Sequence, residues 1–304
     1  MQELVNFNEY PIKNVLNILL KDRTTNKNIV FATNEYQKTV KNISAKSQIT
    51  VGMFENNEIS IEPRVQKSIE EQEKRTKKKA EVFTPSWICN KMNNHCDTEW
   101  FGRENVFNFE NGQEWTTEEK KIKFDKNKTW KDYINSKRLE ITCGEAPYIV
   151  SRYDASNGNI IPIKDRIGIL DRKLRIINEH TRTKKTWFAW VKKAYQSVYG
   201  YEFQGDNLLL ARSNLVNTFV EYKLDRWNEK PTEEELNIIS NIISWNIWQM
   251  DGIHGNVPFG MPRDNENQVD FLELCDIMPK EVDCKIYDWN EKKAIPYKNL
   301  KESE

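Results

Sequence analysis

Four short segments carry the residue types from which a ligand site could be built. They cover residues 80–85, 139–147, 199–208 and 247–253. Gly144 falls at a predicted strand-to-helix turn, where the missing Cβ permits close backbone approach. The N–H groups that follow are expected at a helix N-terminus, which favours a carboxylate. Two acids, Glu202 and Asp251, end the next predicted strands, where their carboxylates could accept hydrogen bonds from a ligand.

Each of these residues also has a purely structural interpretation. Glu202 could be an ordinary exposed acid at the end of a strand. Asp251 precedes Gly252, and Asp-Gly is a common turn pair. Thr84-Pro85 could simply begin a helix, because proline is favoured in the first turn.

The hydrophobic periodicity predicts the elements that position these segments. Helices are expected over 63–80, 86–101, 186–198, 206–222 and 232–244, the last with a capping box formed by Thr232 and Glu235. Strands are expected over 49–53, 59–61, 137–142, 199–203 and 244–250, and extended structure over 158–170. The alternation of strands and helices is typical of a parallel α/β sheet, whose ligands lie at the carboxyl ends of the strands. Gly144, Glu202 and Asp251 are therefore expected on one rim.

In this order the segments resemble the N6-adenine DNA methyltransferases of restriction-modification systems, most closely the Eco57I-like and type I modification subunits. AEVFTP is similar to the family's GxFxTP segment, and LEITCGEAP shares Thr142-Cys143-Gly144 with its DPxCGSG turn. YGYEFQGDNLLLARSNL resembles the acid-ended strand followed by an AxxNL helix, and WQMDGI the segment whose Asp faces adenine. The resemblance covers about residues 80 to 255. Glu145-Ala146 departs from it, standing where the family has Ser-Gly.

The resemblance implies a fold and a cofactor. The expected fold is a Rossmann-like class I methyltransferase sheet with helices on both faces, over residues 80–304. Residues 1–79 would form an N-terminal extension of helix and short strands. S-adenosylmethionine (SAM) is the implied cofactor, and the residues expected to contact it are Phe83, Thr84, Pro85, Thr142, Cys143, Gly144, Ala146, Glu202, Phe203, Asp251 and Gly252.

The catalytic loop of the family, Asn-Pro-Pro-Tyr or Asp-Pro-Pro-Tyr, which holds a flipped adenine, has no intact counterpart. None of the ten prolines are adjacent, and the nearest string, Asn-Val-Pro-Phe at 256–259, is interpreted as a loop after the third strand. No catalytic residue is therefore assigned. We expect a SAM-binding subunit of a DNA adenine-N6 methyltransferase that needs a second polypeptide for catalysis and target recognition. The alternative is a non-catalytic DNA- or protein-binding module that retains the scaffold.

The charges of the chain balance, with 46 basic and 46 acidic residues. This argues against a generally basic DNA binder but permits a local basic face, because charges act over a Debye length of about 10 Å. Arg75, Lys77, Lys78 and Lys79 are candidates for phosphate contacts with double-stranded DNA. Alternatively, they form the solvated C-terminal end of a helix, where positive side chains interact favourably with the negative end of the helix dipole. Under the non-catalytic alternative, the stretch 182–185 would also contact phosphate.

Other classes of function are disfavoured. The five cysteines include no CxxC and the histidines no HxxxH pair, so we expect no zinc site. Glu140 and Asp154 do not form the acidic pattern of a nuclease. No apolar stretch is long enough to span a bilayer, and the first residues lack the apolar core of a signal peptide. We therefore expect a cytoplasmic protein without a membrane partner.

Overall fold

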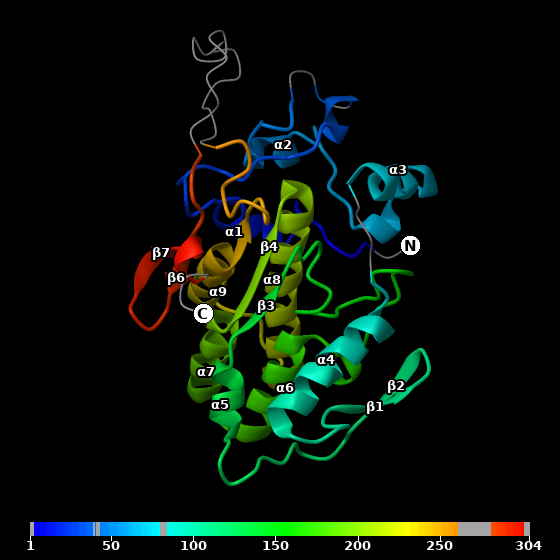
Figure 1. The fold of residues 1–304 in the computed structure, drawn as a ribbon, viewed down its shortest axis with the longest axis vertical. Coiled ribbons are helices and arrows are strands. Elements are labelled where there is room, and N and C mark those ends of the chain that lie inside the picture. The colour runs from blue at the N-terminus through cyan, green and yellow to red at the C-terminus, as the bar shows by residue number, and fades with distance from the viewer. Residues whose placement is uncertain (1–2, 39, 41–42, 80–83, 261–280, 301–304) are drawn as a thin grey trace.

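A parallel sheet of three short strands lies at the centre of the molecule (Figure 1). The computed structural model describes residues 3–38, 40, 43–79, 84–260 and 281–300. The strands are β3 (Arg138–Glu140), β4 (Val198–Glu202) and β5 (Ile247–Gln249), in the order β3-β4-β5. Leu139 lies opposite Tyr199, and Tyr201 opposite Trp248. The chain therefore has a mixed α/β architecture, as the sequence predicts.

Three helices form a layer against this sheet: α7 (Lys184–Gln196), α8 (Gly205–Trp227) and α9 (Glu233–Asn246). A fourth helix, α6 (Ile169–His180), packs against α7 and α8. α8 is buried along most of its length, as expected for a helix that is apolar on several sides. α9 begins with the predicted capping box, in which the Thr232 hydroxyl accepts from Glu235 N–H and the Glu235 carboxylate from Thr232 N–H. α7, α8 and α9 match the predicted ranges apart from a few residues at each end, whereas α6 lies where no helix was predicted.

The opposite face of β4 and β5 is covered differently. Tyr201 and Trp248 pack there against Ile286 and Tyr297, next to the hairpin β6 (Lys285–Asp288) and β7 (Lys293–Pro296). The sequence predicted helices on both faces, whereas the described residues place α7, α8 and α9 together against the strands and a hairpin on the other side. Both crossovers run in the same direction, from β3 to β4 to β5, and right-handed crossovers in one direction place their helices on one face.

The N-terminal segments gather near the upper end of the strands in Figure 1. They contain α1 (Ile12–Leu19), α2 (Val51–Glu55) and α3 (Ile69–Lys79), with short 3-10 helices at Glu35–Lys38 and Arg64–Gln66. α1 contacts α8 and α9, and its buried residues belong to the same core as theirs. The division of the chain at residue 80 stays a prediction.

Three predicted extended regions are wrong. Residues 51–55 form α2, because Phe54 turns inward to pack on Phe7, with ring centroids 4.8 Å apart. No strand lies at 59–61, although Ile59 and Ile61 are buried. Region 158–170 contains a 3-10 helix at Ile163–Asp165 and the start of α6. Its alternating isoleucines therefore belong to a packed loop rather than to a strand.

The remaining elements lie before β3. α4 (Ser86–Phe101) confirms the predicted helix and is followed by the hairpin β1 (Asn108–Asn111) and β2 (Glu114–Thr117), and by α5 (Trp130–Asn135). A further 3-10 helix, Tyr297–Leu300, ends the described chain. In the described ranges no helix has the length and apolar character needed to cross a membrane.

Candidate functional site

The turn after β3 is fastened to the end of β4 by one carboxylate. Glu202 is only 7% exposed; its Oε2 accepts from Gly144 N–H at 2.9 Å and its Oε1 from Gln204 N–H at 3.1 Å. Burial raises the pKa of Glu202, although the two backbone hydrogen bonds oppose this. A carboxylate has about four lone-pair sites, so two further donors can be accepted. Glu202 and Gly144, predicted to share a rim, are thus in direct contact.

The same turn is packed on one side and open on the other. A Cβ at Gly200 in β4 would lie 3.3 Å from the Cys143 side chain, so the absence of one lets the turn pack closely on the strand. Gly144 has a φ of +53°, and a Cβ there would meet no atom within 4 Å. Thr142 and Ala146 also have positive φ, an uncommon backbone conformation for residues with a Cβ. The backbone of Gly144 can therefore be approached closely by a ligand.

No helix begins directly after this turn, which corrects the predicted anion site. The next α-helix in the described chain is α6, which begins at Ile169. The N–H groups of Tyr148 and Ile149 point instead at the Glu140 carboxylate, at 3.4 and 3.2 Å. Burial raises the pKa of Glu140 to about 8, partly offset by these two bonds. This role of Glu140 was not predicted; its signal in the sequence is an acid four residues before the glycine of the turn.

Glu145, which departs from the family pattern, is buried and fully engaged. Its Oε1 accepts from Arg64 N–H at 2.7 Å, and its Oε2 from the Tyr153 hydroxyl at 2.5 Å. Asn214 of α8 donates to the Glu145 carbonyl at 3.1 Å and to the Tyr153 hydroxyl at 3.0 Å. These bonds tie the turn to α8 and to the N-terminal segment.

The segment before α4 reaches the same turn. The side chains of Thr84 and Tyr148 are neighbours. Burial raises the pKa of Tyr148, and a hydrogen bond with the Thr84 side chain partly offsets this rise. Ser86 N–H donates to Asp154 Oδ2 at 2.9 Å and fixes the start of the helix. Thr84 and the half-buried Pro85 therefore lie near the turn. Phe83, with residues 80–82, lies outside the described residues.

Asp251 follows β5 on the same rim, but its carboxylate is engaged locally. Oδ1 accepts from Ile253 N–H at 2.9 Å, and Oδ2 lies 3.0 Å from His254 Nδ1. Burial raises the pKa of Asp251, but the hydrogen bonds from His254 and Ile253 outweigh it, and the pKa is lowered. A Cβ at Gly252 would lie 2.8 Å from the Tyr201 ring, so this turn requires glycine. These contacts fit the turn interpretation of Asp251-Gly252.

Two aromatic rings stand beside this turn. Phe203, directly after β4, lies 6.0 Å from Phe259 between ring centroids. Phe259 belongs to the 256–259 loop, where Asn256 is 6% exposed and donates to Glu281 Oε2 at 2.8 Å. The Asn256 amide oxygen has no hydrogen-bond partner within the described ranges. The loop follows β5 directly, as predicted.

Arg75, predicted to contact DNA phosphate, is instead a buried residue of the core. It is 1% exposed, and its guanidinium reaches Glu35 at 2.6 Å and Asp206 at 2.9 Å. Residues two positions apart on an α-helix, such as Arg75 and Lys77, lie on nearly opposite sides of it, so the charge run in the sequence does not reveal which cation is buried. Lys77 is exposed, 3.7 Å from Glu73. The side chains of Lys78 and Lys79 lie outside the described residues.

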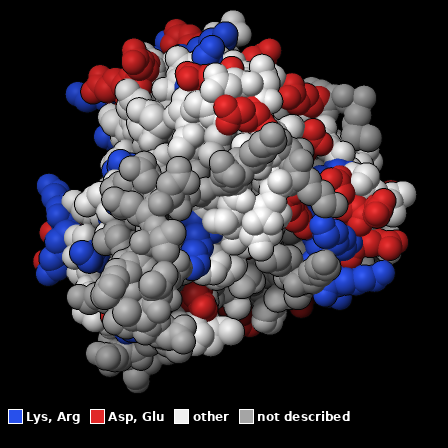
Figure 2. Space-filling model, turned by 90° about the horizontal axis from the view of Figure 1, so that it is seen from above, with Lys and Arg blue, Asp and Glu red and all other residues white. Residues whose placement is uncertain are grey.

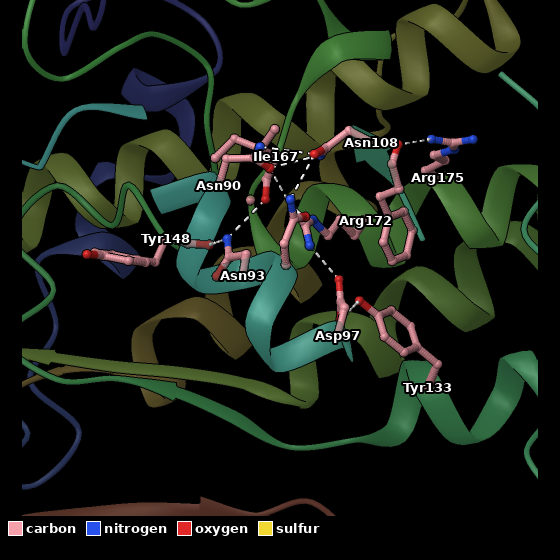
Figure 3. A network of polar contacts seen from close by, with 12 residues as sticks. Asn90, Asn93, Asp97, Asn108, Tyr133, Tyr148, Ile167, Arg172 and Arg175 are labelled. Carbon is pink, nitrogen blue, oxygen red and sulfur yellow. Dashed lines mark hydrogen bonds and ion pairs between the residues drawn. The ribbon is translucent and has the colours of Figure 1, made fainter. Parts of the chain in front are cut away.

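α4 is held in place by a buried polar network rather than by an apolar stripe (Figure 3). Asp97 Oδ2 pairs with Arg172 of α6 at 2.5 Å, and its Oδ1 accepts from the Tyr133 hydroxyl at 2.8 Å. Arg172 also donates to Asn90 and Asn94 at 2.8 Å. This network fixes α4, and with it Thr84, against the rest of the molecule. Within the described ranges, no group of three or more His, Cys, Asp or Glu could hold a metal ion.

Comparisons with protein-family models, with curated proteins and with solved structures found no match for this chain. The functional interpretation therefore rests on the sequence pattern and on the geometry of the rim.

Proposed function

We propose that this chain is a SAM-binding subunit of a DNA adenine-N6 methyltransferase of the restriction-modification type. The observation that carries the proposal is the pair Gly144 and Glu202, bonded across adjacent parallel strands with open space over the glycine. The strand order β3-β4-β5 equals one half of a doubly wound sheet, whose ligands lie beyond the carboxyl ends. A Rossmann-like methyltransferase fold is part of the proposal.

The described residues fit the adenosine end of SAM better than its methionine end. Glu202 would accept the ribose hydroxyls with its two remaining lone-pair sites, and Gly144 would leave room for the ligand beside the backbone. Phe203 and Asp251 would line the adenine side of the same rim. Bound there, SAM would supply a methyl group on a sulfonium, and the protein's contribution would be to position it against the target amine.

Calorimetric titration of SAM and of adenosine into the purified chain tests this assignment. Glu202→Ala should weaken binding of both ligands by about ten-fold or more, equivalent to about 1.4 kcal/mol, because both contain the ribose. Glu202→Gln keeps an oxygen that can accept from Gly144 N–H, so the turn should stay in place. Weaker binding by this variant would therefore report the loss of the ligand contact rather than a change in the turn. Glu291→Ala, an exposed acid in the β6–β7 hairpin, is the matched control and should bind normally. Unchanged affinity in both Glu202 variants would contradict the ribose assignment.

The subunit is proposed to be incomplete alone, because no Asn-Pro-Pro-Tyr loop occurs in the sequence. A second polypeptide would supply the catalytic loop and target recognition, with double-stranded DNA as the substrate. Incubation of the pure chain with DNA and labelled SAM should therefore give no methyl transfer. Robust adenine methylation by the chain alone would refute this part of the proposal.

A second candidate function is a non-catalytic DNA- or protein-binding module that retains the scaffold. The observation that favours it is that Glu140 already accepts from the N–H groups of Tyr148 and Ile149, which were predicted to face the cofactor carboxylate. A folded chain that binds neither SAM nor adenosine would place this candidate first.

A further inference from the structure

Two lysine-rich segments far from the candidate cofactor site have an unusual charge composition. Segment 120–131 contains six lysines and one acid, Asp125. Segment 182–193 contains five basic residues and no acid. Since the whole chain is neutral, such an excess is local, and what matters is whether the fold gathers the two segments.

The fold joins them through an aromatic cluster. The ring of Trp130, in α5, lies 4.6 Å from that of Trp190, in α7, and stacks on His180 at 5.1 Å. Lys131 Nζ lies 5.8 Å from the Trp190 ring centroid, and Lys193 Nζ lies 5.7 Å from it. We call the surface of these two segments the α5–α7 face; it is centred on Trp130 and Trp190, with Lys131 and Lys193 at their rings. The other basic residues of the two segments are Lys120, Lys121, Lys123, Lys126, Lys128, Arg182, Lys184, Lys185 and Lys192.

Two of the acids near this face, Asp132 and Glu179, are used in other contacts. Asp132 caps α5 by accepting from Thr129 N–H at 2.7 Å. Glu179 pairs with Arg175 at 2.9 Å and accepts from Ile122 N–H at 3.0 Å. In the described part of the chain, Lys184 is the one basic residue of this face that forms an ion pair, with Glu229. Contact with aromatic rings holds an ammonium group without neutralising it, so the face keeps its positive charge.

The opposite end of the molecule looks different. Figure 2 views the molecule from above, the end toward which the strands point, and there acidic and basic groups are interspersed. α5 and α7 lie at the lower end in Figure 1. The α5–α7 face therefore lies away from the carboxyl end of β4, which carries Glu202.

We propose that the α5–α7 face binds the phosphate backbone of double-stranded DNA without reading its base sequence. Lysine ammonium groups are point charges on flexible stems, which suit phosphates rather than the bidentate recognition of a base edge. The rings of Trp130 and Trp190 are partly buried against each other, and the ammonium groups of Lys131 and Lys193 lie near the Trp190 ring. We therefore do not expect these rings to stack on bases. This inference goes beyond the proposed cofactor site and does not depend on it.

Fluorescence anisotropy with a labelled duplex of about 20 base pairs, titrated over a series of salt concentrations, tests the proposal. The double variant Lys131→Glu, Lys193→Glu should weaken binding by about ten-fold or more at low salt. Loss of two phosphate contacts should reduce the logarithmic salt slope by about 2, since each contributes roughly 0.9. A duplex of scrambled sequence should bind equally well.

The control variant Lys13→Glu, Lys91→Glu changes the net charge equally at exposed positions on α1 and α4. It should alter affinity much less than the face variant. An equal loss in both variants would show a net-charge effect and overturn the proposal. So would absence of DNA binding by the wild-type chain at low salt, which would point to an acidic protein partner instead. The variant Lys131→Glu, Lys193→Glu should bind SAM as the wild type does, so failure of the cofactor proposal would be visible separately.

Discussion

At the scale of single residues, the protonation of Glu140, which accepts hydrogen bonds beside the turn after β3, makes the stability of the fold depend on pH. Its pKa is about 8 in the folded chain, against an ordinary value of 4.5, because the carboxyl is buried. Between these two pH values the folded state holds the proton more strongly than the unfolded state does. The contribution of Glu140 to stability is therefore fully present below about pH 4.5 and is lost as the pH rises toward 8.

Urea unfolding of wild type and Glu140→Gln over this pH range checks the sign. The amide cannot ionise but keeps an oxygen that accepts from Tyr148 or Ile149 N–H. We expect the wild type to lose stability relative to the variant as the pH rises from about 5 to about 8. Glu291→Gln, at an exposed position, should follow the wild-type curve. Parallel curves for Glu140→Gln and wild type would show that Glu140 titrates normally.

At the scale of elements, α4 depends on polar contacts for its attachment. Asp97 neutralises the buried Arg172 and also accepts from the Tyr133 hydroxyl. Removing one partner of a buried ion pair leaves the other charge uncompensated, which typically costs about 3–5 kcal/mol. Asp97→Ala should therefore lower the free energy of unfolding by about that amount, as measured by urea denaturation.

Glu99→Ala is the matched control, since Glu99 is an exposed acid on the same helix. Surface substitutions of this kind usually change stability by less than about 0.5 kcal/mol. Equal effects of the Asp97 and Glu99 substitutions would mean that the buried network does not hold α4.

At the scale of the whole molecule, Arg75 connects the N-terminal region to the start of α8. Its guanidinium bridges Glu35 and Asp206, and also donates to Gln204 at 3.1 Å. The Arg75 guanidinium holds down the pKa of Asp206, against the effect of burial. Arg75→Met should therefore loosen α3 and speed hydrogen exchange over residues 64–79, as measured by mass spectrometry.

Lys77→Met on the same helix should leave that exchange unchanged, because Lys77 is exposed. Unchanged exchange in Arg75→Met as well would show that α3 is held by other contacts. DNA binding should also be unaffected by Arg75→Met, since a buried arginine cannot reach phosphate.

Much of the secondary structure could be predicted, because it depends on neighbouring residues. The three-and-four spacing of apolar residues indicated α7, α8 and α9, and the Thr232–Glu235 capping box marked the start of one of them. The prediction failed at 49–53, where a short apolar run fits a strand or a helix equally well. The helix is stabilised by the packing of Phe54 on Phe7, which is over forty residues away in the sequence.

The candidate site was predictable only as a set of strand ends. Parallel strands bring their carboxyl ends to one edge, so the order of Gly144, Glu202 and Asp251 in the sequence placed them on a rim. Their hydrogen bonds could not be predicted. Glu140 accepts from the N–H groups of Tyr148 and Ile149, and Glu145 accepts from Arg64 N–H. Both contacts depend on where the folded chain passes, which no local pattern encodes.

The sequence by itself determined the helices, the strand ends and the local balance of charge, since backbone hydrogen bonds and side-chain spacing act over a few residues. Only the tertiary structure decided which charges are buried and which surfaces combine. Arg75 finds its acids 40 and 131 residues away, and the α5–α7 face joins segments about sixty residues apart. A charge is stable in the interior only when a partner is brought to it, and a surface charge acts through its neighbours in space. Both depend on the path of the whole chain.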